Sequence, residues 1–285
     1  MYGIAVMLVL SSGFLHSIWN LYTKRSVNKN VFLWFCHLIS IVVFLPWTLL
    51  EWKTFEISST GLLVVAASVL IHGLYMVLLA AAYSIGDLSQ VYPIMRGTSP
   101  LLVPVAGVLI FNESLSVYGW AGVACIVCGI VLLSNITFKS SSITSFKDFK
   151  APLLALAVGI CIASYIIVDK IALNHVSAVV LIQATNVGNV LALSWAALSS
   201  RGLKKEWAIN WKVTILGGVI APGGYLLFLL ALSLAPVAQL APMREIGTVF
   251  GTIMGIFILR EKQGIRRIFT SLLITIGVVI LGVWG

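Results

Sequence analysis

The sequence predicts an all-α polytopic membrane protein, and three observations carry this prediction. Hydrophobic residues make up 60% of the 285 residues and charged residues 9%, with a mean hydropathy of +1.07. An ordinary soluble domain carries roughly 25% charged residues. Apolar runs follow one another with short polar breaks, and a run of about 20 residues crosses a hydrocarbon core as a helix. The runs are continuously apolar, whereas the strands of a membrane barrel alternate with period two.

Ten runs are long enough to span a bilayer. We predict transmembrane helices over residues 2–22, 31–50, 59–82, 88–111, 116–135, 151–170, 176–198, 213–234, 236–259 and 264–284. The first run lacks a small-residue cleavage site and continues into the basic segment TKRSVNK, so we expect a retained helix and not a signal peptide. The breaks between runs leave no room for an extramembrane domain.

The basic residues predict the orientation of the helices. Fourteen of the 18 Lys and Arg residues fall in the breaks after the first, third, fifth, seventh and ninth runs or, for Arg266 and Arg267, at the start of the run that follows. By the positive-inside rule these breaks face the cytoplasm, which places both termini on the outer side of the cell (inner) membrane. The basic residues are scattered over several breaks and form no patch, so we expect no nucleic-acid partner.

The second half of the chain repeats the first. Matching positions are Gly13 with Gly159, Lys24 with Lys170, Gln90 with Gln239, Met95-Arg96 with Met243-Arg244, and Glu113 with Glu261. Each copy holds five predicted helices, and because five is odd the second copy enters the membrane from the opposite side. The break after the fourth run has no Lys or Arg, while four follow the ninth run, with two in the break and two at the start of the tenth run. The sequence therefore predicts inverted repeats over 1–138 and 151–285, joined by a basic cytoplasmic linker at 139–150.

Inverted repeats are an architecture of secondary transporters, because two similar bundles can expose a central site to either side in turn. The segments AAYSIGDLSQVYPIMRGTSPLLVPVAGVLIFNESLS and LSLAPVAQLAPMREIGTVFGTIMGIFILREK resemble the EamA-type members of the drug/metabolite transporter superfamily over essentially the whole chain. The resemblance implies ten helices around a central cavity, transport of small metabolites, and export as the favoured direction. It does not name the substrate.

Two arginines lie inside predicted helices. Arg96 and Arg244 stand about 12 Å from the nearer helix end at 1.5 Å per residue, and an arginine at mid-membrane costs about 2.5 to 3.5 kcal/mol on insertion scales. One interpretation is an internal ion pair with Glu245, Asp169 or Asp87. The other is that both arginines face the cavity and bind an anionic group of the substrate.

The first predicted helix has a polar face. His16, Trp19 and Asn20 lie within one turn of each other, and Trp19 and Asn20 are candidates for a substrate pocket. His16 is a candidate for proton coupling, since histidine changes charge near neutral pH. The alternative for His16 is a neutral side chain hydrogen-bonded between helices.

Further candidates lie on other predicted helices. His72 is a second candidate for proton coupling, and Tyr75, Tyr92 and Tyr165 are candidates for the substrate pocket or for ordinary packing. Asp169 precedes Lys170 near a helix end, where an interfacial cap is the expected role.

Two further groups are expected to serve the structure. Gln183, Asn186, Asn189 and His37 should form hydrogen bonds between helices, and Glu113 should make a helix-end contact. Hinge or packing roles are expected for residues that loosen a helix or permit close approach, namely Pro93, Pro242, Pro222, Gly223, Gly247 and Gly251.

The sequence thus predicts a secondary active transporter, an exporter or exchanger, for a small polar or amphipathic metabolite. Proton coupling is a hypothesis that rests on His16, His72 and the acids near the arginines. No H-E-x-x-H motif or paired carboxylates appear, so we expect no enzyme, no catalytic residues, no metal and no cofactor. The four cysteines lie in apolar runs, where packing is their usual role. The expected partners are a small-molecule substrate, the lipid bilayer and protons. We expect the protein to be a monomer or a weak homodimer. The alternative is a membrane scaffold or sensor that binds a metabolite.

Overall fold

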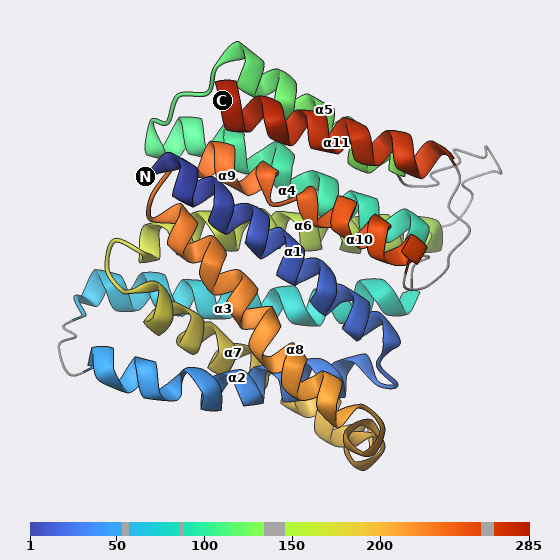
Figure 1. The fold of residues 1–285 in the computed structure, drawn as a ribbon. Helices are drawn as coiled ribbons and strands as arrows, with labels where there is room; N and C mark the ends of the chain where they lie inside the picture. Colours follow the sequence, from blue (N-terminus) through green and yellow to red (C-terminus); the bar gives the residue numbers. More distant parts are fainter. Residues whose placement is uncertain (53–56, 86–87, 134–145, 258–264) are drawn as a thin grey trace. The chain divides into compact units, whose positions relative to one another are not determined.

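The computed structural model describes residues 1–52, 57–85, 88–133, 146–257 and 265–285, and in these ranges all regular structure is α-helical (Figure 1). The helices are α1 (Tyr2–Arg25), α2 (Lys29–Trp52), α3 (Ser59–Ile85), α4 (Leu88–Phe111), α5 (Val117–Leu133), α6 (Phe146–Ala172), α7 (Ala178–Ser199), α8 (Leu203–Leu232), α9 (Val237–Met243), α10 (Ile246–Phe257) and α11 (Ile265–Trp284). By length and composition, seven of these described helices can cross a membrane, and α5 and α11 are shorter apolar helices. The prediction of an all-α polytopic membrane protein is confirmed.

The prediction of one continuous helix over 236–259 is wrong. The chain forms α9, then a break at Arg244 and Glu245, and then α10. Pro242 has no N–H to donate to the carbonyl one turn earlier. The Glu245 amide donates to the Pro242 carbonyl at 3.0 Å, and the Gly247 amide donates to the Arg244 carbonyl at 3.1 Å. These tighter i to i−3 bonds replace the α-helical pattern at the break.

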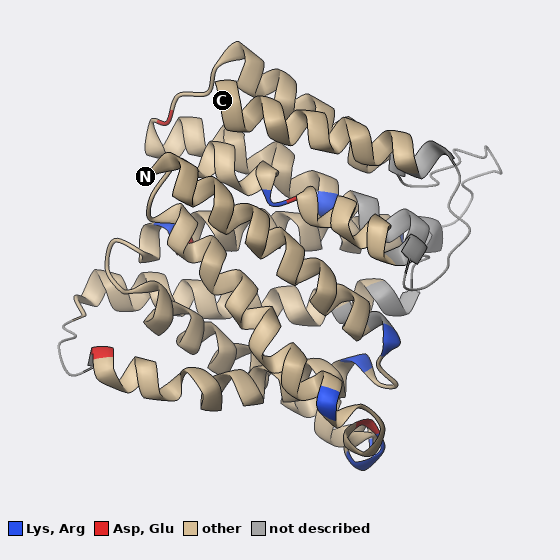
Figure 2. Cartoon of the chain, in the orientation of Figure 1, with Lys and Arg blue, Asp and Glu red and all other residues tan. Residues whose placement is uncertain are grey.

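The chain divides into two compact units, and each unit takes helices from both halves of the sequence. The first unit comprises Met1–Val77 and Val168–Leu234, and the second comprises Leu78–Ile167 and Ala235–Gly285. Figure 2 shows long helical stretches without charge, and in the first unit the basic residues gather where α1 ends and where α2 and α8 begin. The exposed residues there include Arg25, Lys29, Lys204 and Lys205.

In the first unit, α2 and α7 run antiparallel. The Trp34 indole donates to Ser194 at 3.1 Å, and His37 Nδ1 lies 2.9 Å from the Asn186 amide oxygen. A later residue of α2 thus contacts an earlier residue of α7, as in an antiparallel pair. The predicted role of His37 and Asn186 in bonding between helices is confirmed.

A side chain of α2 satisfies the carbonyl that Pro222 releases in α8. A proline leaves the carbonyl four residues earlier without its helical donor, and for Pro222 this is the Gly218 carbonyl. The Ser40 hydroxyl of α2 donates to that carbonyl at 2.6 Å, and Ser40 is fully buried. The irregular turn of α8 is therefore stabilised by its neighbour.

In the second unit, α5 and α11 meet through glycines. A Cβ on Gly277 would lie 2.6 Å from the Gly122 carbonyl oxygen, and a Cβ on Gly129 would lie 2.5 Å from Ile274 Cγ1. Both distances are below normal contact, so only hydrogen fits at Gly129 and Gly277. Because Gly122 faces the later residue of α11 and Gly129 the earlier one, the helices are antiparallel (Figure 1).

Glu113 ties the end of α4 to the beginning of α9. Asn112 follows α4 with φ of 52°, a left-handed conformation that often ends a helix. The Glu113 carboxylate then accepts hydrogen bonds from the Val237 and Ala238 amides at 2.9 and 2.8 Å. A Cβ on Gly107 would lie 2.8 Å from Glu113 Oε2, so this position needs glycine. The expected helix-end contact of Glu113 is confirmed, and it satisfies two amides at a helix N-terminus.

We predict that Gly277→Ala destabilises the protein by about 1–3 kcal/mol, because the methyl group forces α5 and α11 apart. Thermal unfolding of the purified protein in detergent measures the effect. Gly251→Ala is the matched control, since a Cβ there would meet no described atom within 4 Å. Equal melting temperatures for the two variants would contradict the close packing.

We also predict that Ser40→Ala costs about 1–3 kcal/mol, because the buried Gly218 carbonyl loses its donor. In a Pro222→Ala background the helix supplies an amide to that carbonyl, so the cost of Ser40→Ala should shrink. A double-mutant cycle of unfolding free energies measures this coupling. Thr48→Val serves as control, since the Thr48 hydroxyl bonds only to the Phe44 carbonyl of its own helix. Additive effects of Ser40→Ala and Pro222→Ala would count against the interaction.

Candidate functional site

Both compact units contain buried charged side chains among their described residues. In the second unit, α4 carries Arg96, and the break between α9 and α10 carries Arg244 and Glu245. Arg96 Nε lies 3.5 Å from Glu245 Oε2, with side chains 14% and 7% exposed. Both guanidinium groups act electrostatically on the Glu245 carboxylate. The predicted pairing of Arg96 with Glu245 is thus present, and substrate binding by the arginines stays a prediction.

The group of Arg96, Arg244 and Glu245 differs between the two copies of the repeat. Arg96 corresponds to Arg244, so the residue that follows each arginine is Gly97 in the first half and Glu245 in the second. With all three side chains ionised, Arg96, Arg244 and Glu245 together carry a net charge of +1. Guanidinium groups offer planar sets of donors and the carboxylate offers acceptors. Such a group can bind an anionic ligand or the hydroxyls of a polar one.

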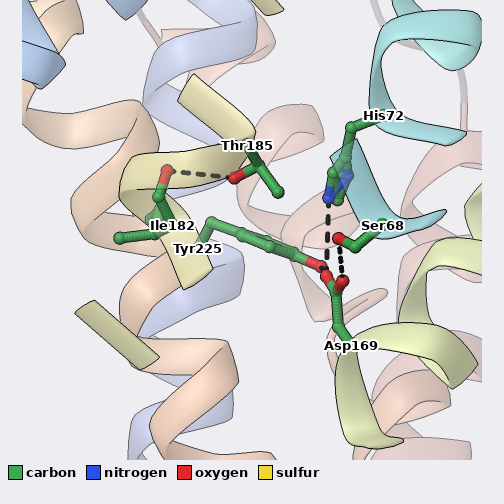
Figure 3. A network of polar contacts seen from close by, with 6 residues as sticks. All are labelled: Ser68, His72, Asp169, Ile182, Thr185 and Tyr225. Atoms are coloured by element: carbon green, nitrogen blue, oxygen red, sulfur yellow. Dashed lines mark hydrogen bonds and ion pairs between the residues drawn. The ribbon is translucent and has the colours of Figure 1, made fainter. Parts of the chain in front are cut away.

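The first unit contains a buried carboxylate at Asp169, near the end of α6 (Figure 3). Asp169 is 0% exposed. The hydroxyls of Ser68 from α3 and Tyr225 from α8 donate to its two different oxygens. His72, one turn after Ser68 on α3, places Nε2 3.4 Å from Asp169 Oδ2. Three helices therefore meet at one carboxylate.

The expectation that Asp169 is an interfacial cap is wrong. The neighbouring Lys170 does act at a helix end, since its ammonium donates to the Leu232 carbonyl where α8 ends. Asp169 itself points to Ser68 of α3 and Tyr225 of α8. A sequence shows the neighbours of Asp169 on its own helix and not those on other helices. The available signal was the spacing of Ser68 and His72, which places both on one face of α3.

The polar face of α1 lies against an apolar cluster of the first unit. Trp19 is buried beside Phe32 of α2 and Met76 of α3, and Tyr75 packs on the same cluster. The rings of Trp19 and His16 are 5.2 Å apart between centroids. The Trp19 indole nitrogen has no hydrogen-bond partner among the described residues.

The remaining predicted residues have varied surroundings. Asn20 is half-buried, and Tyr165 is buried in the part of α6 that belongs to the second unit. The side chains of Tyr92 and Pro93 lie outside the described residues. Gln183 donates to the Ile41 carbonyl at 3.0 Å, which confirms its role between helices.

The candidates for hinge or packing roles also differ in their surroundings. Pro222, Pro242 and Gly247 are buried, whereas Gly251 is exposed. A Cβ on Gly223 would meet no described atom within 4 Å. The hinge roles stay predictions.

Comparison with known proteins now gives the family. The EamA-like transporter family matches residues 3–135 and again residues 149–283, which together cover nearly all of the chain. This chain belongs to the EamA-like transporter family. It is a multi-pass membrane protein of a family of transporters, and no catalytic family is indicated.

Curated relatives carry transport names. The chain is 25% identical over 218 residues to the "Putative sugar uptake protein lmo0176" of Listeria monocytogenes serovar 1/2a, covering 72% of this chain and 70% of that protein. It is 26% identical over 218 residues to the "Putative sugar uptake protein lin0215" of Listeria innocua serovar 6a, with the same coverage. A solved crystal structure shares the fold, with a TM-score of 0.76, 14% identity, and coverage of 97% of this chain and 95% of that one.

We predict that Glu245→Gln costs about 3–5 kcal/mol, because it leaves the Arg96 guanidinium beside a neutral partner. Arg96→Gln should cost less, because Arg244 still acts on the Glu245 carboxylate. The double variant should cost less than the sum of the single variants. Thermal unfolding in detergent measures all three, and Arg25→Gln at the exposed end of α1 is the control. Strictly additive costs would mean that the pair contributes nothing to folding.

Proposed function

We propose that this EamA-family member is a secondary active transporter that moves a small polar or amphipathic metabolite by alternating access. The observation that carries the proposal is the buried group of Arg96, Arg244 and Glu245 at the break between α9 and α10. Discontinuous helices with charged or irregular backbone at mid-membrane are the binding elements of many secondary transporters. Charged residues in such a place are costly and are retained for function.

The proposal includes inverted repeats over 1–138 and 151–285, with a cytoplasmic linker at 139–150 and both termini outside. Helices at corresponding places in the two halves run antiparallel where they pair, as for α2 with α7 and α5 with α11. The pairing of α5 with α11 supports this in detail. A shift of 148 residues converts Gly122 into Thr270, Ile126 into Ile274 and Gly129 into Gly277.

The contacts of the two glycines follow the same shift. A Cβ on Gly277 would approach the Gly122 carbonyl oxygen and Ile126 Cγ1, at 2.6 and 2.8 Å. A Cβ on Gly129 would approach the Thr270 carbonyl oxygen and Ile274 Cγ1, at 3.2 and 2.5 Å. These two contacts of each glycine thus have counterparts on the other helix, as expected for a twofold relation between antiparallel copies.

The orientation is supported by the charge at one end of the first unit. Gly202 between α7 and α8 lies beside Asn28 between α1 and α2. Arg25, Lys29, Lys204 and Lys205 surround these two turns and are exposed (Figure 2). Basic residues gathered at one end of a helical membrane unit favour a cytoplasmic position for that end.

Two substrate classes fit the arginine group. A net charge of +1 favours a carboxylate or phosphate group on the substrate. The donors of Arg96 and Arg244 with the acceptor of Glu245 also suit the vicinal hydroxyls of a sugar, and the relatives from Listeria are named for sugar uptake. We propose that the direction of transport is export or exchange. Uptake is the competing direction, because the two relatives are named for uptake.

We predict that the purified protein in proteoliposomes moves a radiolabelled solute from a panel of sugars, sugar phosphates, organic acids and amino acids. Arg96→Gln and Arg244→Gln should each reduce that flux by about 10- to 100-fold, the loss of one charged hydrogen bond of about 1.5–3 kcal/mol. Counterflow with label placed on either side gives the direction. Arg25→Gln is the matched control and should transport normally.

The result separates the substrate classes and the alternative function. If only anionic solutes move and both arginine variants lose them, the arginines bind the anion. Solute binding by thermal shift without any flux would indicate the scaffold or sensor instead. Normal rates and affinities in both arginine variants, with correct insertion, would overturn the substrate role of the arginines.

A further inference from the structure

The network of Asp169, Ser68, His72 and Tyr225 in the first unit has no role in the substrate binding proposed for the arginines. It combines features of a proton-binding site. Asp169 is fully buried, at the crossing of α6 with α3 and α8. Ser68, its donor on α3, is nine residues after the start of that helix, which is about 13 Å along a span of about 30 Å. Although Asp169 is near the end of α6, its carboxylate is therefore fully buried beside a residue well inside α3.

Among the described residues, no Lys or Arg pairs with the Asp169 carboxylate. Its described hydrogen-bond donors are the Ser68 and Tyr225 hydroxyls, which are neutral. His72 on α3 is close enough to form an ion pair only when it carries a proton. The next residue, Lys170, directs its ammonium to the Leu232 carbonyl at the end of α8. A buried carboxylate with neutral donors is stabilised when it binds a proton, which it can later release.

The titratable groups around the network come from each neighbouring helix. His72 lies on α3 and Tyr225 on α8, and their rings are 5.5 Å apart between centroids. His37 on α2 acts electrostatically on His72, and its Nδ1 is held by Asn186 of α7. On α6 itself the adjacent charge is Lys170. Figure 3 shows the part of this set around the carboxylate, where His72, Ser68 and Tyr225 point toward Asp169.

We propose that Asp169 is the residue that binds and releases the coupling proton, with His72 as its exchange partner. This proposal rests on the proposed transport function and names the proton site that the function needs. When water on one side supplies a proton, an O–H bond forms on the carboxylate and its negative charge disappears. The new carboxylic acid must donate a hydrogen bond, to His72 Nε2 or to the Tyr225 oxygen.

Protonation of Asp169 changes the hydrogen bonds that join α6 to α3 and α8. In the ionised form, Asp169 accepts from Ser68 of α3 and from Tyr225 of α8 at the same time. In the protonated form one of its oxygens becomes a donor, and if this O–H donates to the Tyr225 oxygen, the hydrogen bond from Tyr225 is reversed. Release of the proton to water on the other side restores both contacts. Protonation is thereby linked to the packing of α6 against α3 and α8.

We assign the coupling role to His72 and not to His16, because His72 contacts the Asp169 carboxylate. The His16 ring packs beside Trp19 on α1, and its described ring contact is with that indole. His72, the other histidine predicted for coupling, contacts a carboxylate directly. His16→Ala is therefore expected to keep its response to a pH gradient.

A measurement on the purified full chain tests the site without any substrate. Infrared difference spectra between acidic and alkaline pH report the C=O stretch of protonated carboxyl groups, and the probe is the proton itself. Asp169→Asn should abolish one band of the wild type, and Tyr225→Phe should keep the band at a changed wavenumber. Glu206→Gln is the matched control, since Glu206 is also fully buried in the first unit but accepts from the Asn28 amide and the Asn210 side chain.

Transport completes the test. For the panel solute that the wild type moves, Asp169→Asn should lose the stimulation by a pH gradient, by about 10-fold or more, while solute exchange at equal pH continues. If Asp169→Asn does not fold, Ser68→Ala and His72→Gln replace it and should weaken the stimulation. An unchanged carboxyl spectrum in Asp169→Asn, or an unchanged gradient response in the variants, would overturn the proposal. If no panel solute moves in the wild type, the transport function fails while the infrared result still decides the proton site.

Discussion

Polar groups that this chain places among apolar helices must find their partners inside the protein, because hydrocarbon offers none. The clearest case is the carbonyl of Gly218, which Pro222 leaves without a helical donor and which the Ser40 hydroxyl of a neighbouring helix satisfies. Glu113 does the same for two amides at the beginning of α9. At these two places a residue outside the helix supplies the missing hydrogen bond. This dependence joins helices that are far apart in the sequence.

The same constraint governs the buried charges. Arg96 is tolerated inside a helix because Glu245 lies 3.5 Å away, at a break where the backbone is already irregular. Asp169 is tolerated because two hydroxyls from two other helices donate to it. The two groups differ in kind. The arginine group has more cations than anions, whereas Asp169 has neutral donors and one base that can take a proton. Attraction of a polar ligand suits the first, and exchange of a proton suits the second.

Departures from the internal repeat coincide with these two groups. The packing of α5 with α11 follows the repeat closely, contact by contact. Glu245, by contrast, stands where the first half has Gly97, so the carboxylate occurs in one copy alone. At the position of Asp169, the first half has Thr23 one residue before Lys24. A duplicated scaffold needs the same packing in both copies, whereas a binding site needs only one set of polar groups.

The sequence by itself determined the class of protein, the places of most helices, the repeat and the presence of two buried arginines. These follow from hydropathy, length and residue identity along the chain, which are local properties. Only the tertiary structure decided that the ninth apolar run is broken at Arg244 and Glu245, and that Asp169 is buried under Ser68, His72 and Tyr225. It also showed close packing at Gly122 and Gly277, which the pattern of glycines in α10 did not predict. The physical reason is that a partner for a polar atom, or a backbone close enough to exclude a Cβ, comes from another helix, and helix pairing is not encoded in the order of residues along either one.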